Sequence, residues 1–392
     1  MKTKLPAILM IGLLLLAGCK TPVPTLSKSY QRTIEHSTQV DVPIVYEAMQ
    51  IALSLTDTYQ SDPNLVRKNT PYYQAMISHF GAHKSHQLVL ELEKTLKKAG
   101  AYGEINTLIR LQALNYELQN GKLHNNRNYS IPLVYNIAPY PLFLLHNNKR
   151  LINSFIKETG FEAFYQQHKN QYASLVRINY ALCNYAGMQQ WLAQEFPNVP
   201  HESLRVVFSP LTGGLHNVRE LRSRNGATKQ TIMFVSAPDY EMSRTDWTFP
   251  EKSAYASRVV FTEINHTYIN PVTDQYKAQL AAAMQNLSYW KADKVTGGYN
   301  SFILTFNEYM TWAAFTLYAH DTYPTDVFER VTAQQEVFMV KRGFTRFKEF
   351  NRELLHLYKQ QPKEGKVEDL YPAIIKWMKT HYNTAQQQNT AS

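Results

Sequence analysis

The spacing of apolar residues in the first half of the chain constrains its fold most strongly, because they recur every three or four positions there. This periodicity predicts amphipathic helices. They cover residues 42–55, 72–80, 87–98, 104–118, 149–156, 161–171 and 175–196. Pro63, Gly100 and Gly160 lie between them and supply breaks, and no repeat of fixed period is present. We therefore expect a helical region over residues 36–200.

The pattern changes near His201. Residues 204–209 and 231–236 are short runs of apolar and β-branched residues, and a charged, glycine-containing connection joins them. They predict neighbouring strands of one sheet. Helical patterns return over residues 255–269, 274–293, 301–319, 326–339, 344–359 and 370–381, and residues 383–392 predict a disordered tail. The expected fold class is α+β and mainly helical, with a small sheet in a second domain over residues 201–382.

The N-terminus has the features of a bacterial lipoprotein signal. Lys2 and Lys4 precede an apolar run over residues 5–16, and the sequence Leu-Ala-Gly-Cys ends at Cys19. This arrangement resembles a lipobox, which implies cleavage before Cys19 and lipidation of that residue. An ordinary signal anchor with an incidental cysteine is the alternative. Residues 1–19 are then the signal and residues 20–35 a tether, and the acyl chains hold the protein at the membrane.

The residue after the cysteine gives the expected localisation. Lys20 follows Cys19 where Asp would signal inner-membrane retention, which resembles sorting to the outer membrane of the cell envelope. The formal charge is +10, but Lys and Arg are dispersed and no nucleic-acid motif is present, so we expect no nucleic-acid partner. Cys183 is the only other cysteine, so the core must hold the fold without an internal disulfide once Cys19 is acylated.

Residues 258–271 carry the candidate chemistry. Thr262 and His266 are four positions apart, so a helix places them on one face with Glu263 beside them. About 40 residues later, Glu308 lies in the middle of an apolar predicted helix. A carboxylate there needs a partner, since burying it alone is costly. That partner is a metal ion, or else Arg, Tyr or a backbone group.

This stretch, R-V-V-F-T-E-I-N-H-T-Y-I-N-P, resembles the gluzincin metallopeptidases, and among them exported bacterial zincin-like lipoproteins with an H-E-x-x-H core. The resemblance implies that His266 and Glu308 are zinc ligands and that Glu263 is the catalytic residue that activates the metal-bound water. Thr262 occupies the position of the first His ligand. A neutral hydroxyl is a poor zinc ligand, so we expect zinc binding to be weakened or lost.

Three functions remain open from the sequence. The first is a catalytically impaired peptidase homologue that binds peptide or another cell-envelope component, with residues 204–209 or 231–236 as a strand edge for the peptide. The second is an active zinc peptidase with a substitute ligand, for which His216, His320 and Asp321 are candidates. The third is a structural or glycan-binding surface lipoprotein. Two further clusters are candidate sites. His79, His83 and His86 are spaced for a competing metal site, and Tyr135, Tyr140 and Phe143 are candidates to line a peptide or glycan groove.

Overall fold

The structure is a computed structural model that describes residues 24–34, 38–100, 104–130, 145–199, 203–226, 228–293 and 299–390. Side chains of residues 104, 239–240 and 384–390 are not described. Cys19 lies outside these ranges, as do Tyr135, Tyr140 and Phe143.

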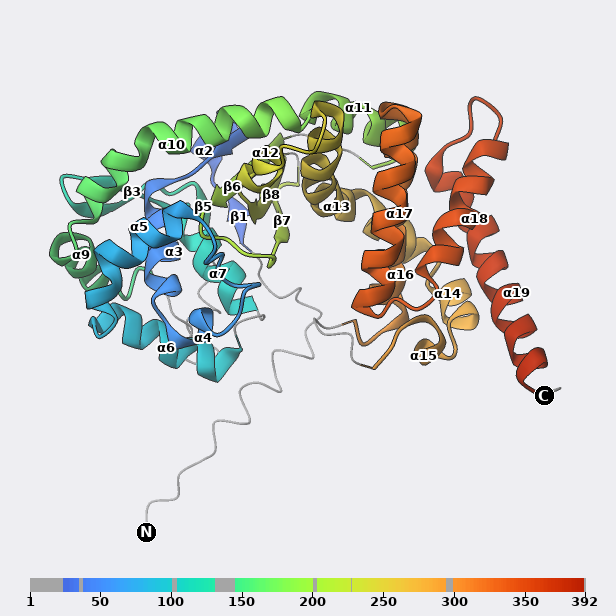
Figure 1. Cartoon of the computed structure of the whole chain (residues 1–392), viewed down its shortest axis with the longest axis horizontal. Coiled ribbons are helices and arrows are strands. Elements are labelled where there is room, and N and C mark those ends of the chain that lie inside the picture. Colours follow the sequence, from blue (N-terminus) through green and yellow to red (C-terminus); the bar gives the residue numbers. More distant parts are fainter. Residues whose placement is uncertain are drawn as a thin grey trace, which may run out of the picture.

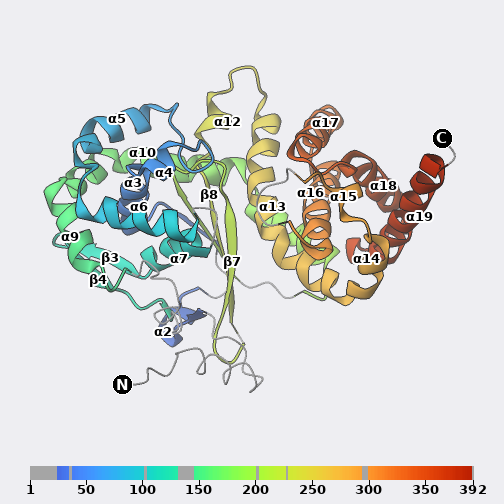
Figure 2. The same cartoon turned by 90° about the horizontal axis from the view of Figure 1, so that it is seen from below.

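A six-stranded mixed sheet runs between two groups of helices (Figures 1 and 2). Its order is β2-β6-β8-β7-β1-β5. The strands are β1 (Thr25–Leu26), β2 (Thr38–Asp41), β5 (Tyr129–Ser130), β6 (Ser203–Ser209), β7 (Asn217–Arg222) and β8 (Lys229–Ser236), while β3 (Tyr116–Gln119) and β4 (Lys122–Asn125) form a separate hairpin. β2, β6 and β8 are parallel, and β7 is antiparallel to β8. The chain is thus mainly helical with a mixed sheet, which is consistent with the predicted α+β class.

The two predicted strands, β6 and β8, are neighbours in the interior of the sheet. β6 and β8 pair along their whole lengths, and nearly every residue of both is buried, which explains why they read as continuous apolar runs. Neither is an edge strand, so the expectation that one of them offers a free edge to a peptide is wrong. The sequence predicts a connection between the two strands, but part of it forms β7, which pairs with β8 along its length and with β1 at Arg222.

The N-terminal helices match the predicted periodicity in most places. They are α3 (Ile44–Ser54), α4 (Asp57–Gln60), α5 (Pro71–Phe80), η1 (Gly81–His83), α6 (Gln87–Ala99), α7 (Glu104–Ala113), α9 (Lys149–Glu158), α10 (Phe161–Leu182) and α11 (Tyr185–Glu195). The helix expected over residues 104–118 ends early, because β3 begins at Tyr116. β2 and β5 bring this region into the sheet, so a boundary at residue 200 does not separate two structural units.

The segment expected to be a tether is packed from Pro24 onward. β1 pairs with β5, and α2 (Lys28–Gln31) follows it directly. Leu26 is 2% exposed and Ile34 is 3% exposed, so both contribute to the core. Apolar side chains at these two positions anchor the segment, and residues 20–23 and 35 of the expected tether lie outside the described structure.

The C-terminal half is an all-helical group beside the sheet (Figures 1 and 2). It contains α12 (Asp239–Ser243), α13 (Phe249–Gln275), α14 (Lys277–Ala283), α15 (Leu287–Trp290), α16 (Phe302–Thr322), α17 (Thr325–Arg342), α18 (Phe347–Gln360), η2 (Val367–Leu370) and α19 (Tyr371–Thr390). The single helix predicted over residues 274–293 is split into α14 and α15. α19 continues to Thr390, where a disordered tail was expected. Among the described residues, no helix combines the length and apolar character that crossing a bilayer requires.

The helix with the candidate motif is longer than the sequence predicts. α13 was expected to stop at Asn270, before Pro271, but Pro271 lies inside it. Proline removes one backbone N–H from the helix, and its ring disfavours helical geometry at the preceding residue. Val272 and Thr273 are buried beyond it, so packing of the last turn outweighs this local cost.

Candidate functional site

Three helices build the candidate site. α13 starts with a capping box in which Thr248 and Glu251 bond each other's backbone, which fixes where this long helix begins. α16 starts at its N-cap, Ser301, whose hydroxyl accepts from the Leu304 N–H. α13, α16 and α17 are all in mutual contact. His266 on α13 and Glu308 on α16 meet at this junction.

The two proposed ligands lie close together. The Nε2 atom of His266 is 3.9 Å from Oε2 of Glu308. The other ring nitrogen, Nδ1, lies 3.3 Å from the hydroxyl of Thr311 on α16. The expectation that His266 and Glu308 converge is therefore met in geometry, although this contact alone does not make either residue a metal ligand.

A cation from the same protein already pairs with Glu308. Nη1 of Arg342, the last residue of α17, lies 2.7 Å from Oε1 of Glu308. Nε1 of Trp312 donates to the same oxygen at 2.9 Å. Glu308 is 4% exposed, and burial alone would lower the pKa of the Arg342 guanidinium, but the neighbouring Glu308 charge raises it. Glu308 thus has the charge partner that a buried carboxylate needs.

Glu263, the residue that the resemblance implies is catalytic, has a perturbed carboxyl pKa. Burial raises the pKa of its carboxyl to about 8, and the negative charge of Glu308 adds to that rise, while Arg342 opposes it. A carboxyl with this pKa is mostly protonated at pH 7. It can donate a hydrogen bond but does not readily accept a proton from water.

Thr262 does not turn its hydroxyl toward His266. Its Oγ1 donates to the carbonyl oxygen of Arg258 at 2.9 Å and lies 3.3 Å from that of Val259. Both acceptors belong to the preceding turn of α13, a common arrangement for Thr inside a helix. The hydroxyl is therefore occupied within its own helix.

These residues do not fit a catalytic zinc ion. Such an ion takes three protein ligands and keeps one open position for water. Here one of the three positions is Thr262, and the Glu308 carboxylate is paired with Arg342. Within the described part of the chain, no group of three His, Cys, Asp or Glu residues is arranged to hold a metal ion.

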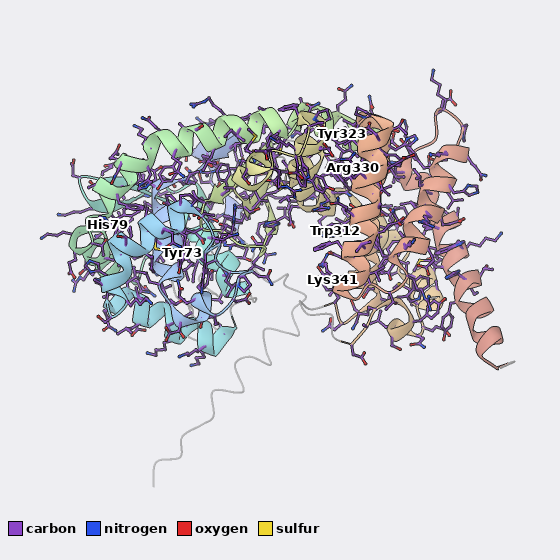
Figure 3. The ribbon with its side chains drawn as sticks, viewed as in Figure 1. Tyr73, His79, Trp312, Tyr323, Arg330 and Lys341 are labelled. Carbon is purple, nitrogen blue, oxygen red and sulfur yellow. The ribbon has the colours of Figure 1, made fainter. Side chains whose placement is uncertain are left out.

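The substitute ligands considered from the sequence lie elsewhere. His320 is twelve residues beyond Glu308 on α16, about 18 Å along the helix axis, and it pairs with Asp321 at 2.9 Å. His216 is in the loop before β7, where its Nε2 lies 3.2 Å from the Ser236 hydroxyl. Of the competing histidine cluster, His79 contacts the Thr159 carbonyl at 2.7 Å in the N-terminal half (Figure 3), and His86 caps α6.

Aromatic rings and arginines extend the site along α13, α16 and α17. The ring centroids of Trp312 and Phe338 are 5.3 Å apart. The Arg258 guanidinium lies 5.7 Å from the Trp312 centroid, and that of Arg342 lies 5.4 Å from it. Trp312 is on the side of these helices that faces the N-terminal half (Figure 3), and Phe338 is 44% exposed. The site thus opens onto a surface that combines aromatic area with positive charge.

A second buried polar cluster lies in the N-terminal half. Glu47 on α3 is fully buried and accepts a hydrogen bond of 2.6 Å from the Tyr72 hydroxyl, which lies 2.6 Å from that of Tyr172. Burial raises the pKa of Glu47 to about 7. Nearby, Arg110 is 1% exposed and donates to the Leu215 carbonyl, and burial and this cation lower the pKa of His216 to about 4.

Sequence reasoning missed the residues that complete both clusters. Trp312 stands four positions after Glu308 on one helix face, a spacing that could have revealed it. Arg342 lies 34 residues after Glu308, on a different helix, and no local pattern links the two. The same holds for Glu47 and Tyr172, which come from α3 and α10.

The chain was compared with family models, with curated proteins and with solved structures. No family model, no curated protein and no solved structure matches it.

Proposed function

We propose that this protein is a lipid-anchored component of the bacterial cell envelope, with a zincin-like site that has lost its catalytic metal and binds peptide. The Arg342–Glu308 ion pair carries this proposal. Its guanidinium supplies, within the chain, the positive charge that a metal would otherwise bring to Glu308. Thr262 offers no imidazole at the position where the resemblance implies a first ligand, and its hydroxyl is bonded within its own helix.

The surface around this ion pair suits a peptide. Phe338 is 44% exposed on α17, and its ring centroid lies 5.7 Å from the Arg342 guanidinium, so it offers apolar area beside that charge. The resemblance implies an edge strand beside the helix that carries the motif. β7 can serve as that strand, because it contacts α13 and pairs with β1 only at Arg222 among the described residues. A peptide can therefore add backbone hydrogen bonds at β7 and place a carboxylate or apolar side chain near α17.

Peptide binding without cleavage is the expected behaviour. A fluorescently labelled casein peptide should bind the protein, measured by anisotropy, and remain intact by chromatography with zinc or with EDTA. Phe338→Ser should weaken binding about tenfold, because it removes a large exposed apolar contact. Val340→Ser, 42% exposed on the same helix, is a control for a general loss of apolar surface. Zinc-dependent cleavage that EDTA abolishes would contradict the proposal.

The membrane anchor has its own test. Cys19→Ser should leave the protein unprocessed or release it into the soluble fraction, because the acyl chains are the proposed attachment. The measurement is the distribution of the protein between membrane and soluble fractions, together with its mass. A variant of mature size that stays on the membrane as the wild type does would refute lipidation at this residue.

A further inference from the structure

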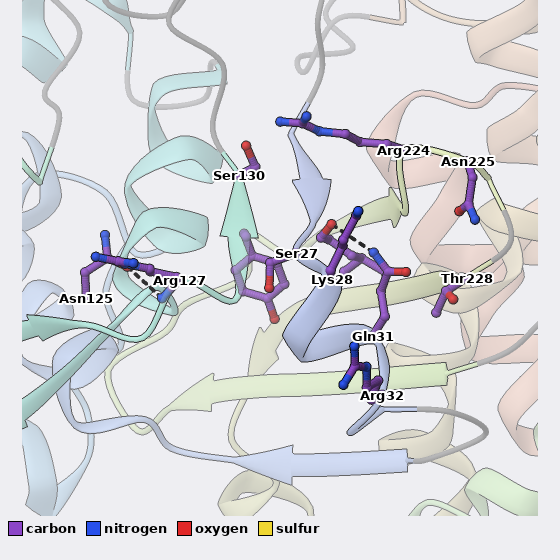
Figure 4. Close-up of a pocket in the computed structure, with 12 residues that line it drawn as sticks. Ser27, Lys28, Gln31, Arg32, Asn125, Arg127, Ser130, Arg224, Asn225 and Thr228 are labelled. Carbon is purple, nitrogen blue, oxygen red and sulfur yellow. Dashed lines mark hydrogen bonds between the residues drawn. The ribbon is translucent and has the colours of Figure 1, made fainter.

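A basic cavity lies near the N-terminal end of the described chain. Its volume is about 920 Å³, and residues from three segments line it: β1 with α2, the link between β4 and β5, and the turn between β7 and β8. Figure 4 shows Lys28, Arg32, Arg127 and Arg224 around it. The cavity is remote in sequence from the His266 site, and the proposed function makes no use of it.

Among the described residues, the charge of this cavity has no acidic counterpart. No described Asp or Glu lines the cavity, and none of the four cations forms an ion pair with another described residue. Two cations on the strands beside it, by contrast, share an acidic partner. Glu220 pairs with Arg222 at 2.6 Å and with Lys229 at 2.8 Å. The four cavity side chains are exposed, so they remain charged and available to a ligand.

The walls of the cavity are held together by backbone bonds. The Ser27 N–H donates to the Asn128 carbonyl at 2.9 Å, which joins the start of α2 to the β4–β5 link. β1 pairs with β5 at Thr25 and with β7 at Arg222. The cations therefore project from segments whose relative positions are fixed before a ligand arrives, which reduces the entropy lost on binding.

The lining chemistry matches a phosphate group. Guanidinium groups bind phosphate oxygens with paired hydrogen bonds, and ammonium groups add a point charge. Hydroxyls and amides of Ser27, Thr228 and Asn225 supply further polar contacts around the cations. The cavity is larger than a phosphate ion needs, so it has room for the group that carries the phosphate.

The position of the cavity indicates where that phosphate comes from. Pro24 is five residues after Cys19, and five extended residues span at most about 18 Å. If Cys19 is acylated, as the proposed function holds, the cavity stays within about that distance of the membrane surface. We infer that this cavity binds the phosphate of an anionic lipid headgroup in the membrane that holds the anchor, and so fixes the orientation of the protein on it.

The test uses the mature protein, residues 20–392, without acyl chains, so that binding does not depend on lipidation of Cys19. It is mixed with sedimenting vesicles of phosphatidylcholine alone or with added phosphatidylglycerol. The wild type should bind only the anionic vesicles. The triple variant Lys28→Gln/Arg127→Gln/Arg224→Gln should bind them about a hundredfold more weakly, since each cation near an anionic surface contributes roughly a factor of five.

A matched control removes the same charge elsewhere. Lys363, Lys376 and Lys379 are exposed in the C-terminal helical group, and their replacement by Gln should weaken binding only a few-fold. Circular dichroism checks that both triple variants are folded. Equal losses in the two variants, or equal binding to both kinds of vesicle, would overturn the inference. A third result would also overturn it: the wild type binds inorganic phosphate but not anionic vesicles, and the cavity variant does not bind phosphate. The ligand would then be a free anion.

Discussion

Arg342→Leu lowers the free energy of unfolding by about 3 kcal/mol at neutral pH, because it leaves the Glu308 carboxylate buried without its charge partner. Glu308 is 4% exposed, and after the substitution the Trp312 N–H still bonds it and His266 Nε2 still lies 3.9 Å away, but the guanidinium that contacts it at 2.7 Å is gone. The loss should shrink as the pH falls, since a stranded carboxylate can then take up a proton. Chemical denaturation at several pH values measures both effects.

Two further variants separate the ion pair from simple loss of a side chain. Glu308→Gln combined with Arg342→Leu should be more stable than Arg342→Leu alone, because the stranded charge is gone. Arg330→Leu is the matched control on the same helix: Arg330 pairs with buried Glu251, but Thr248 also bonds that carboxylate, and Arg330 is 53% exposed. Its loss should cost less than about 1 kcal/mol. Equal losses for Arg330→Leu and Arg342→Leu would contradict a special role for Arg342.

Between pH 4.5 and 7, ionisation of Glu47 should lower the free energy of unfolding of the wild type by about 3 kcal/mol, and Glu47→Gln should lack this decrease. Burial raises the pKa of Glu47 from 4.5 to about 7, so the folded state binds this proton more tightly than the unfolded state does. The stabilisation is complete below pH 4.5 and is lost as the pH rises to about 7. Each pKa unit corresponds to about 1.4 kcal/mol. Gln cannot ionise, so the variant lacks this loss.

The comparison between variants is essential here. His216 makes the free energy of unfolding change with pH in the opposite direction. Its pKa is about 4 in the folded state and 6.5 in the unfolded state, so between these pH values the unfolded state binds a proton that the folded state does not. The two effects offset each other in the wild type over pH 4.5 to 6.5. Subtracting the wild-type stability from that of Glu47→Gln at each pH isolates Glu47. A constant difference from pH 4.5 to 8 would show that Glu47 ionises normally. Tyr72→Phe should raise the Glu47 pKa further, since its hydroxyl stabilises the carboxylate.

Local pattern predicted most of the secondary structure. Three- and four-residue spacing located α3, α5, α6, α9 and α16 to within a few residues, and β-branched runs located β6 and β8. It failed where tertiary contacts decide. Pro271 stays inside α13 because the turn beyond it is buried, and the charged strand β7 exists because β8 pairs with it along its whole length.

The candidate site was predictable only in part. Helix spacing placed Glu263 beside His266, and the meeting of His266 with Glu308 was expected from the resemblance. The partner of Glu308 was not, because Arg342 reaches it from another helix through packing of α16 on α17. A sequence pattern records neighbours along one element, whereas the charge state of a buried carboxylate depends on whatever element packs over it.

In the proposed function, Thr262 and Arg342 contribute separately to the loss of zinc binding, and variants at the two positions should separate their effects. Thr262→His restores the missing imidazole but leaves Glu308 paired, so it should raise zinc affinity only modestly. Combined with Arg342→Leu, it gives a site of two His and one Glu with an unpaired carboxylate. Zinc affinity should then rise by orders of magnitude, as a third good ligand generally brings.

The most direct measurement is zinc titration by calorimetry, with metal content of the purified protein, for the wild type, both single variants and the double variant. The wild type should hold no stoichiometric zinc, and only Thr262→His/Arg342→Leu should bind one ion tightly. Loss of that binding on adding His266→Ala would confirm the site in the redesigned protein. A wild-type protein that retains one tightly bound zinc, and releases it on His266→Ala, would contradict the account.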